Sequence, residues 1–113
     1  MNILVGNSTI QTLPVLVQYE PEGNIYKGTP ETTIGYSNIH TCLSVTQNGT
    51  LNIKQSIDGI LWDITDTYNI IIDNGNNTKV ENTTVAIKEK YCKVEFTNTG
   101  VVASSIRLLT FMS

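Results

Sequence analysis

The chain has few charged residues, and they do not gather. Asp, Glu, Lys and Arg make up 15% of its 113 residues, and the formal net charge is −3. The cations are mixed with carboxylates along the sequence, so no stretch has the basic character that binding to nucleic acid or anionic lipid requires. We therefore expect neither a nucleic-acid partner nor a membrane partner. Solubility must rest largely on uncharged Asn, Thr and Ser.

Cysteine is equally scarce, with only Cys42 and Cys92 present. Cys92 shares a strand face with Val94, whereas Cys42 alternates out of phase with Leu43, so the two sulfur atoms need not meet. We expect two free thiols in a reducing compartment, with a disulfide as the alternative.

No long apolar run occurs, and the N-terminus has no basic segment before its few apolar residues. That run is too short for a signal peptide or a membrane span, so we expect no secretion by the usual route. Four Asn-x-Ser/Thr triplets are expected by chance in a chain this rich in Asn and Thr; they begin at Asn7, Asn48, Asn76 and Asn82.

Helical periodicity is almost absent, and apolar residues instead alternate with polar ones in about eight short runs. This pattern and a length of one domain predict an all-β fold, a single antiparallel β-sandwich of jelly-roll-like type spanning residues 1–113. The runs lie at 13–19, 39–45, 51–53, 60–64, 68–72, 85–87, 92–96 and 106–108.

Two dipeptides predict tight hairpin turns. Asn48-Gly49 and Asp58-Gly59 each join alternating runs, and both are typical of two-residue turns with positive φ. Together they predict a three-stranded antiparallel meander. Pro14 within the first run predicts that this strand lies at a sheet edge, because proline cannot donate a ladder hydrogen bond.

The segment from Pro21 to Asn38 is rich in Gly and Pro and has little alternation, which predicts a long loop with at most short strands. Tyr26 and Tyr36 lie in it. Tyrosine offers a large contact surface at low entropic cost, so we consider both as anchors for a protein partner. The alternative is that they pin the loop onto the sandwich.

No catalytic, cofactor-binding or metal-binding constellation is visible. His40 is the only histidine and has no recognisable partner. Glu20, Glu22 and Glu31 would need a larger cleft than so short a chain builds for glycosidase chemistry. Four aspartates match no EF-hand spacing and are better explained as turn residues; they are Asp58, Asp63, Asp66 and Asp73. We expect a protein that is not an enzyme.

Trp62 has two possible roles. Its phase matches Ile60 and Ile64, which predicts that it packs in the core with Val94, Phe96 and Leu108. An exposed indole would instead suit the stacking platform of a carbohydrate-binding module.

Three separated patterns are similar to a known family. They are Gln55-Ser-Ile-Asp-Gly-Ile-Leu-Trp62, Lys90-Tyr-Cys-Lys-Val-Glu-Phe-Thr-Asn98 and Ser105-Ile-Arg-Leu-Leu-Thr110. In this order they resemble a small β-sandwich domain of virion proteins from large DNA viruses and some tailed phages. Lys93 and Ile106 stand where that pattern usually has Arg and Phe. A looser likeness links the same elements to discoidin-type, galactose-binding-like domains.

The resemblance implies a virion structural protein: a minor capsid, cement or decoration component. Its partners would be larger capsid proteins or further copies of itself, in a homo-oligomer. It would reside in the virion, and in the host cytoplasm during assembly. The alternative from another class is a carbohydrate-binding module used for attachment, so a glycan partner stays possible.

Overall fold

The computed structural model describes residues 3–4, 10–13, 24–72, 78–100 and 104–113. These residues form ten strands. Eight strands have three or more residues, and the other two have two residues each. The all-β prediction is therefore confirmed. The strands are β1 (Ile3–Leu4), β2 (Ile10–Leu13), β3 (Ile25–Lys27), β4 (Glu31–Thr32), β5 (Asn38–Val45), β6 (Gly49–Ser56), β7 (Ile64–Ile70), β8 (Lys79–Ala86), β9 (Tyr91–Asn98) and β10 (Ser104–Met112).

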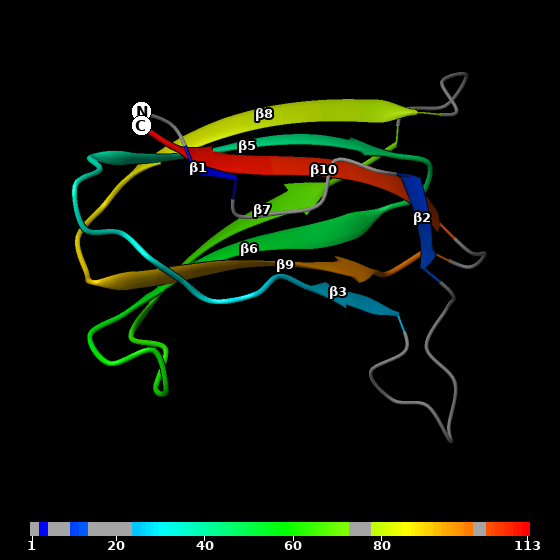
Figure 1. The fold of residues 1–113 in the computed structure, drawn as a ribbon. Coiled ribbons are helices and arrows are strands. Elements are labelled where there is room, and N and C mark those ends of the chain that lie inside the picture. The colour runs from blue at the N-terminus through cyan, green and yellow to red at the C-terminus, as the bar shows by residue number, and fades with distance from the viewer. Residues whose placement is uncertain (1–2, 5–9, 14–23, 73–77, 101–103) are drawn as a thin grey trace.

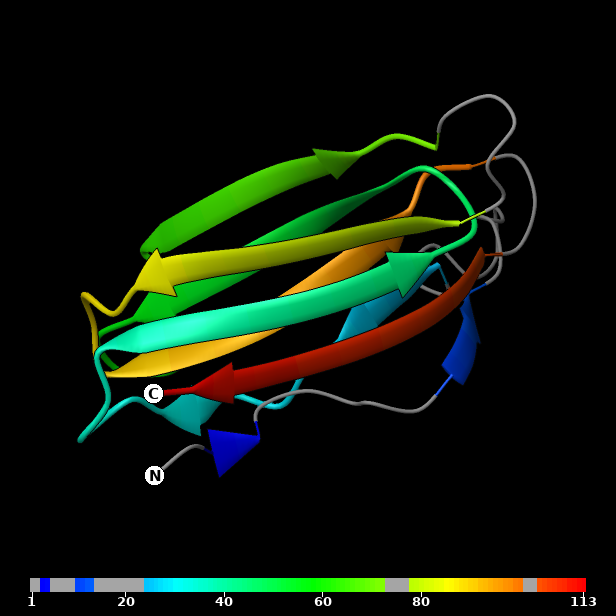
Figure 2. The same cartoon turned by 90° about the horizontal axis from the view of Figure 1, so that it is seen from above.

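The strands form two antiparallel sheets packed face to face (Figure 1). Sheet I has the order β1-β10-β5-β8, and β2 also pairs with β10. Sheet II has the order β3-β9-β6-β7, and β4 also pairs with β9. Viewed from above, β8, β5 and β10 of sheet I lie side by side over sheet II (Figure 2). The predicted sandwich is thus confirmed.

The core lies between the two sheets, where alternate side chains of the long strands meet. In β5 and β9 every second residue is buried, as the period of two requires. Val94, Phe96 and Leu108 are at most 1% exposed, which confirms their predicted core positions. The remaining buried apolar residues are Ile39, Leu43, Val45, Leu51, Ile53, Ile70, Val85, Cys92, Ile106 and Met112.

The predicted meander is wrong, because β5 and β6 belong to different sheets. β5 pairs with β8 and β10, whereas β6 pairs with β7 and β9. The short segment 46–48 crosses from one sheet to the other, and neither Asn48 nor Gly49 has positive φ. Gly49 is instead the first residue of β6, where the ring of Phe96 leaves no room for a side chain.

The second predicted hairpin exists, but its connection is longer than two residues. β6 ends at Ser56 and β7 begins at Ile64, so residues 57–63 form the loop. Gly59 has the expected positive φ of 77°. Trp62 lies in this loop, is only half-buried and is not part of the core, so its predicted core position is wrong. The loop breaks the alternation that placed it there.

The Gly- and Pro-rich segment contains only the short strands β3 and β4, as predicted for its described part, which begins at residue 24. Among the described strands β2 pairs with β10 alone, which places it at a sheet edge. Pro14, on which the edge prediction rested, lies outside the described residues. No helix able to cross a membrane occurs among the residues described.

Candidate functional site

The loop 57–63 presents three large aliphatic side chains to solvent. Ile57 is 70% exposed, Ile60 77% and Leu61 70%. They lie within five consecutive residues of one loop at the end of the sandwich, and we call this group the apolar tip. Large aliphatic side chains exposed together on one loop are candidates for a contact site.

A buried serine organises the loop from below. Ser56 is fully buried, and its Oγ accepts hydrogen bonds from the amide N–H groups of Gly59 (2.9 Å) and Asp58 (3.2 Å). The single hydroxyl proton of Ser56 can be donated to the carbonyl oxygen of Leu61 or to Oδ1 of Asp58, since both acceptors lie within hydrogen-bond distance of Oγ. One side chain thus closes a turn of six residues.

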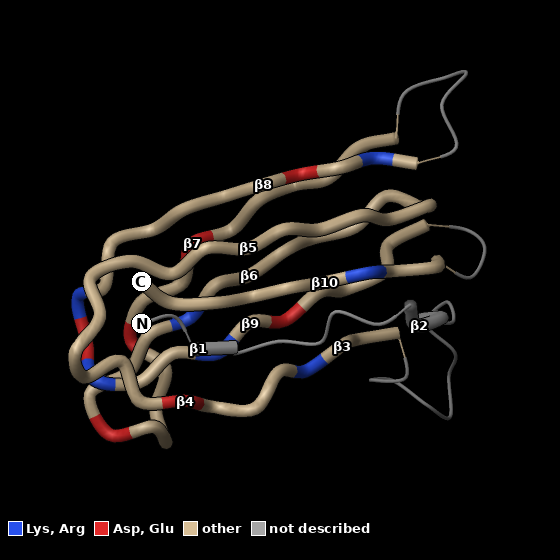
Figure 3. The backbone as a smooth tube through the Cα atoms, turned by 45° about the horizontal axis from the view of Figure 1, so that its top comes forward, with Lys and Arg blue, Asp and Glu red and all other residues tan. Residues whose placement is uncertain are grey.

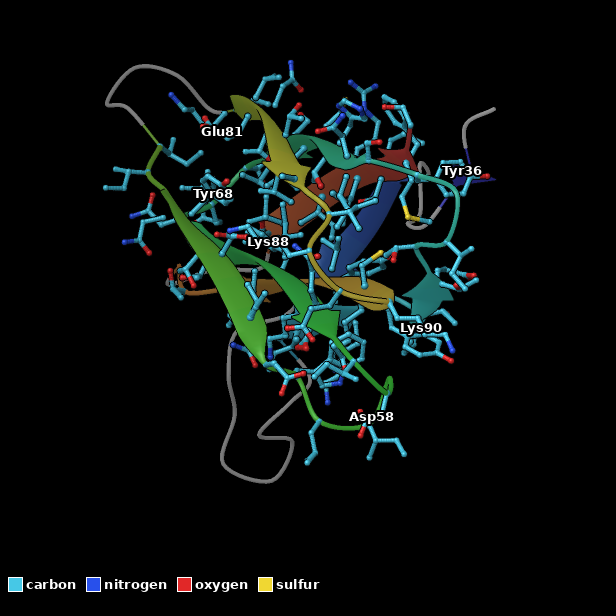
Figure 4. The ribbon with its side chains drawn as sticks, turned by 90° about the vertical axis from the view of Figure 1, so that its left-hand side faces the viewer. Tyr36, Asp58, Tyr68, Glu81, Lys88 and Lys90 are labelled. Atoms are coloured by element: carbon cyan, nitrogen blue, oxygen red, sulfur yellow. The ribbon has the colours of Figure 1, made fainter. Side chains whose placement is uncertain are left out.

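Asp58 completes this turn. Its Oδ1 accepts the amide N–H groups of Ile60 (2.8 Å) and Leu61 (3.0 Å), as predicted for a turn-forming aspartate. These two hydrogen bonds lower the pKa of Asp58 below its ordinary value of 3.8, and the bond from Ile60 has the larger effect. Its carboxylate is therefore ionised near neutral pH. In Figure 4 Asp58 lies on the part of the loop that projects from the sandwich.

Asp63 secures the base of the loop. Its Oδ2 accepts the amide N–H of Ile57 (3.2 Å), and its own N–H donates to the carbonyl of Gln55 (3.0 Å). Hydrogen bonds between the loop backbone and the side chains of Ser56, Asp58 and Asp63 therefore fix the loop, while the side chains of Ile60 and Leu61 stay exposed. A surface ordered before binding loses little conformational entropy on contact.

Aromatic and charged residues of sheet II adjoin the loop. The ammonium of Lys93 lies 4.4 Å from the centre of the Trp62 ring, a cation–π contact. Burial alone would raise the pKa of Glu95. The ammonium groups of Lys54 and Lys93 lie 3.2 Å and 3.3 Å from its Oε1, and their combined effect outweighs burial and lowers that pKa. Lys93 thus links Trp62 of the loop to Glu95 of β9.

Glu89 brings a further carboxyl group near the two aspartates. Burial raises the pKa of Glu89, and its hydrogen bond with Asp63 and the charges of Asp63 and Asp58 raise it further. Its Oε2 is buried and lacks a hydrogen-bond partner. Even so, no group of three or more potential ligands in the described part of the chain is arranged for a metal ion, and Asp73 lies outside that part.

The two tyrosines considered as partner anchors lie elsewhere. Tyr26 is opposite Phe96 in the β3–β9 pair and so faces the core, and Tyr36 follows β4. Both are half-buried and pack against the core cluster. Figure 4 shows Tyr36 well separated from Asp58 at this end of the molecule. A role in partner binding stays a prediction for both.

His40 and the cysteines are strand residues. The His40 ring stacks on Phe111 with 4.8 Å between centroids, and its nitrogens bond the hydroxyls of Thr84 and Ser113. Both cysteines are free, as predicted. Cys92 is fully buried, and this burial, with the nearby charge of Glu31, raises its pKa to about 11. Glu20 and Glu22 lie outside the described residues.

A shallow pocket that the sequence did not predict opens on the outer face of sheet I. It has a volume of about 340 Å³. Three strands distant in sequence supply its walls: β5, β8 and β10. Its lining residues are Cys42, Leu43, Ser44, Val80, Asn82, Arg107 and Leu109.

Comparisons with known proteins identify the fold. No family model and no curated protein matches the chain. All of the chain matches a crystal structure of PBSX exported protein XepA with a TM-score of 0.72 at 15% identity, and it spans 37% of that chain. The likeness shows a shared β-sandwich fold. 

Two carbohydrate-binding modules match more weakly. The BiXyn10A module CBM1 without ligand has a TM-score of 0.47 at 9% identity. A module of Cellvibrio mixtus lichenase 5A with cellotriose has a TM-score of 0.45 at 12% identity. Each match includes all of this chain and 96% of the module.

Proposed function

We propose that this protein is a non-enzymatic structural component of a virion, a minor capsid, cement or decoration protein that acts through protein–protein contacts. The observation that carries the proposal is the apolar tip, held in place by Ser56 and Asp58. The protein would reside in the virion, and in the host cytoplasm during assembly, with larger capsid proteins or its own copies as partners.

The energetics of the tip suit a docking element. Burying an isoleucine or leucine side chain fully contributes about 1.5–3 kcal/mol. Ile57, Ile60 and Leu61 remain in water in the isolated chain, so this free energy is available for binding. The backbone of the loop is already ordered by hydrogen bonds, which lowers the entropic cost of association.

Two edges of the sheets suit docking less well. β8 is one edge strand of sheet I, and β7 is one edge strand of sheet II. Glu81 on β8 lies opposite the buried Leu43, and Asp66 on β7 lies opposite the buried Ile53, so both carboxylates are on the inner faces. Inward-pointing charges on edge strands hinder the addition of another strand. This arrangement favours the loop over these two edges as the contact.

The three sequence patterns that resemble virion domains add support from a different direction. The first pattern includes the loop itself, from Gln55 to Trp62. In the structure its Ser56, Asp58 and Gly59 are the residues that shape the turn. The pattern therefore includes the residues that fix the conformation of the loop on which the aliphatic side chains are exposed.

Incorporation into particles tests the proposal. Ile60→Ser with Leu61→Ser removes two of the three side chains of the apolar tip without removing a hydrogen bond that shapes the loop. Ile34→Ser is the matched control, because Ile34 is 68% exposed but lies outside the loop. Mass spectrometry of particles from the source should find the wild type and the control, and at least tenfold less of the double variant. Absence of the wild-type protein from the particles would contradict the proposal.

The position of Trp62 favours carbohydrate binding as a second candidate function. Its indole is half-buried beside Lys93, and Tyr91 lies next to Gly59, so two aromatic rings adjoin the same loop. Stacking on such rings is a common way to bind sugars. A glycan array with and without calcium should then give a signal that Trp62→Ala abolishes, whereas silence on the array excludes this candidate.

A further inference from the structure

The pocket on sheet I has the chemistry to receive an apolar side chain next to a carboxylate. On the outer face, Ser44 of β5 lies between Val80 of β8 and Arg107 of β10, and Cys42 is opposite Leu109 in the adjacent row. Val80 is 59% exposed, so an aliphatic wall of the pocket is open to solvent. The guanidinium of Arg107 adds a permanent positive charge.

The apolar tip and the pocket cannot meet within one molecule. The loop extends sheet II at the end where Ser56 pairs with Tyr91. The pocket lies on the opposite sheet, near the start of β8, where Val80 follows Lys79. In Figure 3 the basic positions of β8 and β10 lie toward the end of the sandwich remote from this loop. Any contact between the two surfaces must therefore join different molecules.

We propose that the apolar tip of one copy docks in the sheet I pocket of a second copy, which gives the proposed structural protein a head-to-tail contact with itself. Ile60 and Leu61 would meet the aliphatic side chains of Val80 and Leu109, which line the pocket from β8 and β10 on either side of β5. The carboxylate of Asp58, at the tip, would meet the guanidinium of Arg107. The proposal rests on the proposed function, and it names the partner.

Complementarity of apolar character and charge favours a copy of this chain as the occupant. The tip combines exposed aliphatic groups with carboxylates, and the pocket combines aliphatic groups with a cation. Opposite charges at the rim set the register of such a contact, while apolar burial supplies most of its free energy.

The contact has a defined symmetry consequence. The two surfaces are different, so the interface is heterologous, and each bound copy leaves one free tip and one free pocket. Repetition of the contact builds a ring or an open row. Association should therefore continue past the dimer as the protein concentration rises.

Complementation between two defective variants tests the contact. Ile60→Ser with Leu61→Ser removes the two tip side chains that would enter the pocket but keeps the pocket. Val80→Glu places a carboxylate in the pocket but keeps the tip. Circular dichroism and thermal melting establish that each variant is folded. By sedimentation velocity, the wild type and the Ile34→Ser control should form species larger than dimers, and each defective variant alone should be monomeric.

A 1:1 mixture of the two variants should form dimers and nothing larger, because only one intact tip and one intact pocket remain in each pair. A monomeric mixture, or a wild type that stays monomeric at the highest concentration, would overturn the contact. So would a tip variant that still assembles.

Incorporation into particles separates this inference from the function beneath it. If particles lack the variant with Ile60→Ser and Leu61→Ser but incorporate Val80→Glu normally, the tip binds another capsid protein. That result would contradict the copy-to-copy contact and would still support the structural function. Absence of the wild-type chain from particles would remove the function itself. Loss of both variants supports the contact.

Discussion

The ring of Phe96 fills the space that a side chain on Gly49 would occupy. A Cβ at position 49 would overlap Cζ of Phe96 and would lie 2.6 Å from the carbonyl oxygen of Thr97. Both contacts are far closer than van der Waals contact, and the second involves backbone. We predict that Gly49→Ala lowers the free energy of unfolding by about 1–3 kcal/mol, measured by urea denaturation.

A double-mutant cycle identifies the cause of this loss. Phe96→Leu shortens the side chain that meets position 49, so Gly49→Ala should cost less in that background than in the wild type. Equal costs in both backgrounds would place the strain at the backbone of Thr97 instead.

This glycine shows why the sequence misled about one connection. Asn48-Gly49 between alternating runs is typical of a hairpin, and sequence alone cannot distinguish a glycine required for positive φ from one required for its small size. The strands themselves were predictable, because β5 and β9 are buried on one face along their whole length. Only long-range pairing decides that β5 and β6 enter different sheets.

The candidate site was harder to predict for a related reason. Ile60 and Trp62 have the phase of a strand, yet Ser56 and Asp58 bind the backbone of the loop and hold these residues outside the ladder. The pattern therefore indicated a core where the molecule has an exposed tip. The pocket was beyond prediction, because Ser44, Val80 and Arg107 become neighbours only through the sheet topology.

Gln55 joins the two sheets through hydrogen bonds of a fully buried amide. Its Nε2 donates to the carbonyl of Ala86 (3.0 Å), and its Oε1 accepts the N–H groups of Lys88 (2.7 Å) and Glu89 (3.1 Å). Gln55→Leu leaves these three partly buried backbone groups without this partner, so we expect a loss of about 3 kcal/mol in unfolding free energy. The exposed hydrogen bond of Thr67 provides the control: Thr67→Ala should change stability by about 0.5 kcal/mol or less.

The corrected position of Trp62 predicts a modest role in stability. Phe96→Ala empties the centre of the core and should cost about 3–5 kcal/mol. Trp62→Ala removes a half-buried ring and should cost roughly 1–2 kcal/mol. Trp62 is also the only tryptophan, so its fluorescence in the native protein should be quenched by acrylamide. Resistance to quenching, together with a core-sized loss, would return Trp62 to the core.

The raised pKa of Glu89 predicts a stability that depends on pH. The folded protein holds this proton more tightly than the unfolded chain, so the contribution of Glu89 to stability is greatest below its ordinary pKa of 4.5 and is lost as pH rises through the folded value. Glu89→Gln removes the charge that burial and the two aspartates disfavour. The variant should melt at a higher temperature than the wild type at pH 7, and the difference should shrink toward pH 4. Glu81→Gln makes the same chemical change on β8 and should not reproduce this pH-dependent gain.

The two thiols should react in sequence with an aromatic disulfide reagent. Cys42 is half-buried and lines the open pocket, whereas Cys92 is fully buried and its pKa of about 11 keeps it protonated at neutral pH. One thiol per chain should therefore react in the native protein, and the second only after denaturation. Cys42→Ala should abolish the first phase, and Cys92→Ala should leave it intact.

The same reaction reports on docking at the pocket. If the apolar tip of another copy covers Cys42, labelling of the wild type should slow as protein concentration rises. In the variant with Ile60→Ser and Leu61→Ser, the rate should not depend on concentration, because the tip is absent while the pocket is intact. A slowing of equal size in both proteins would show that the pocket is covered by something other than the tip.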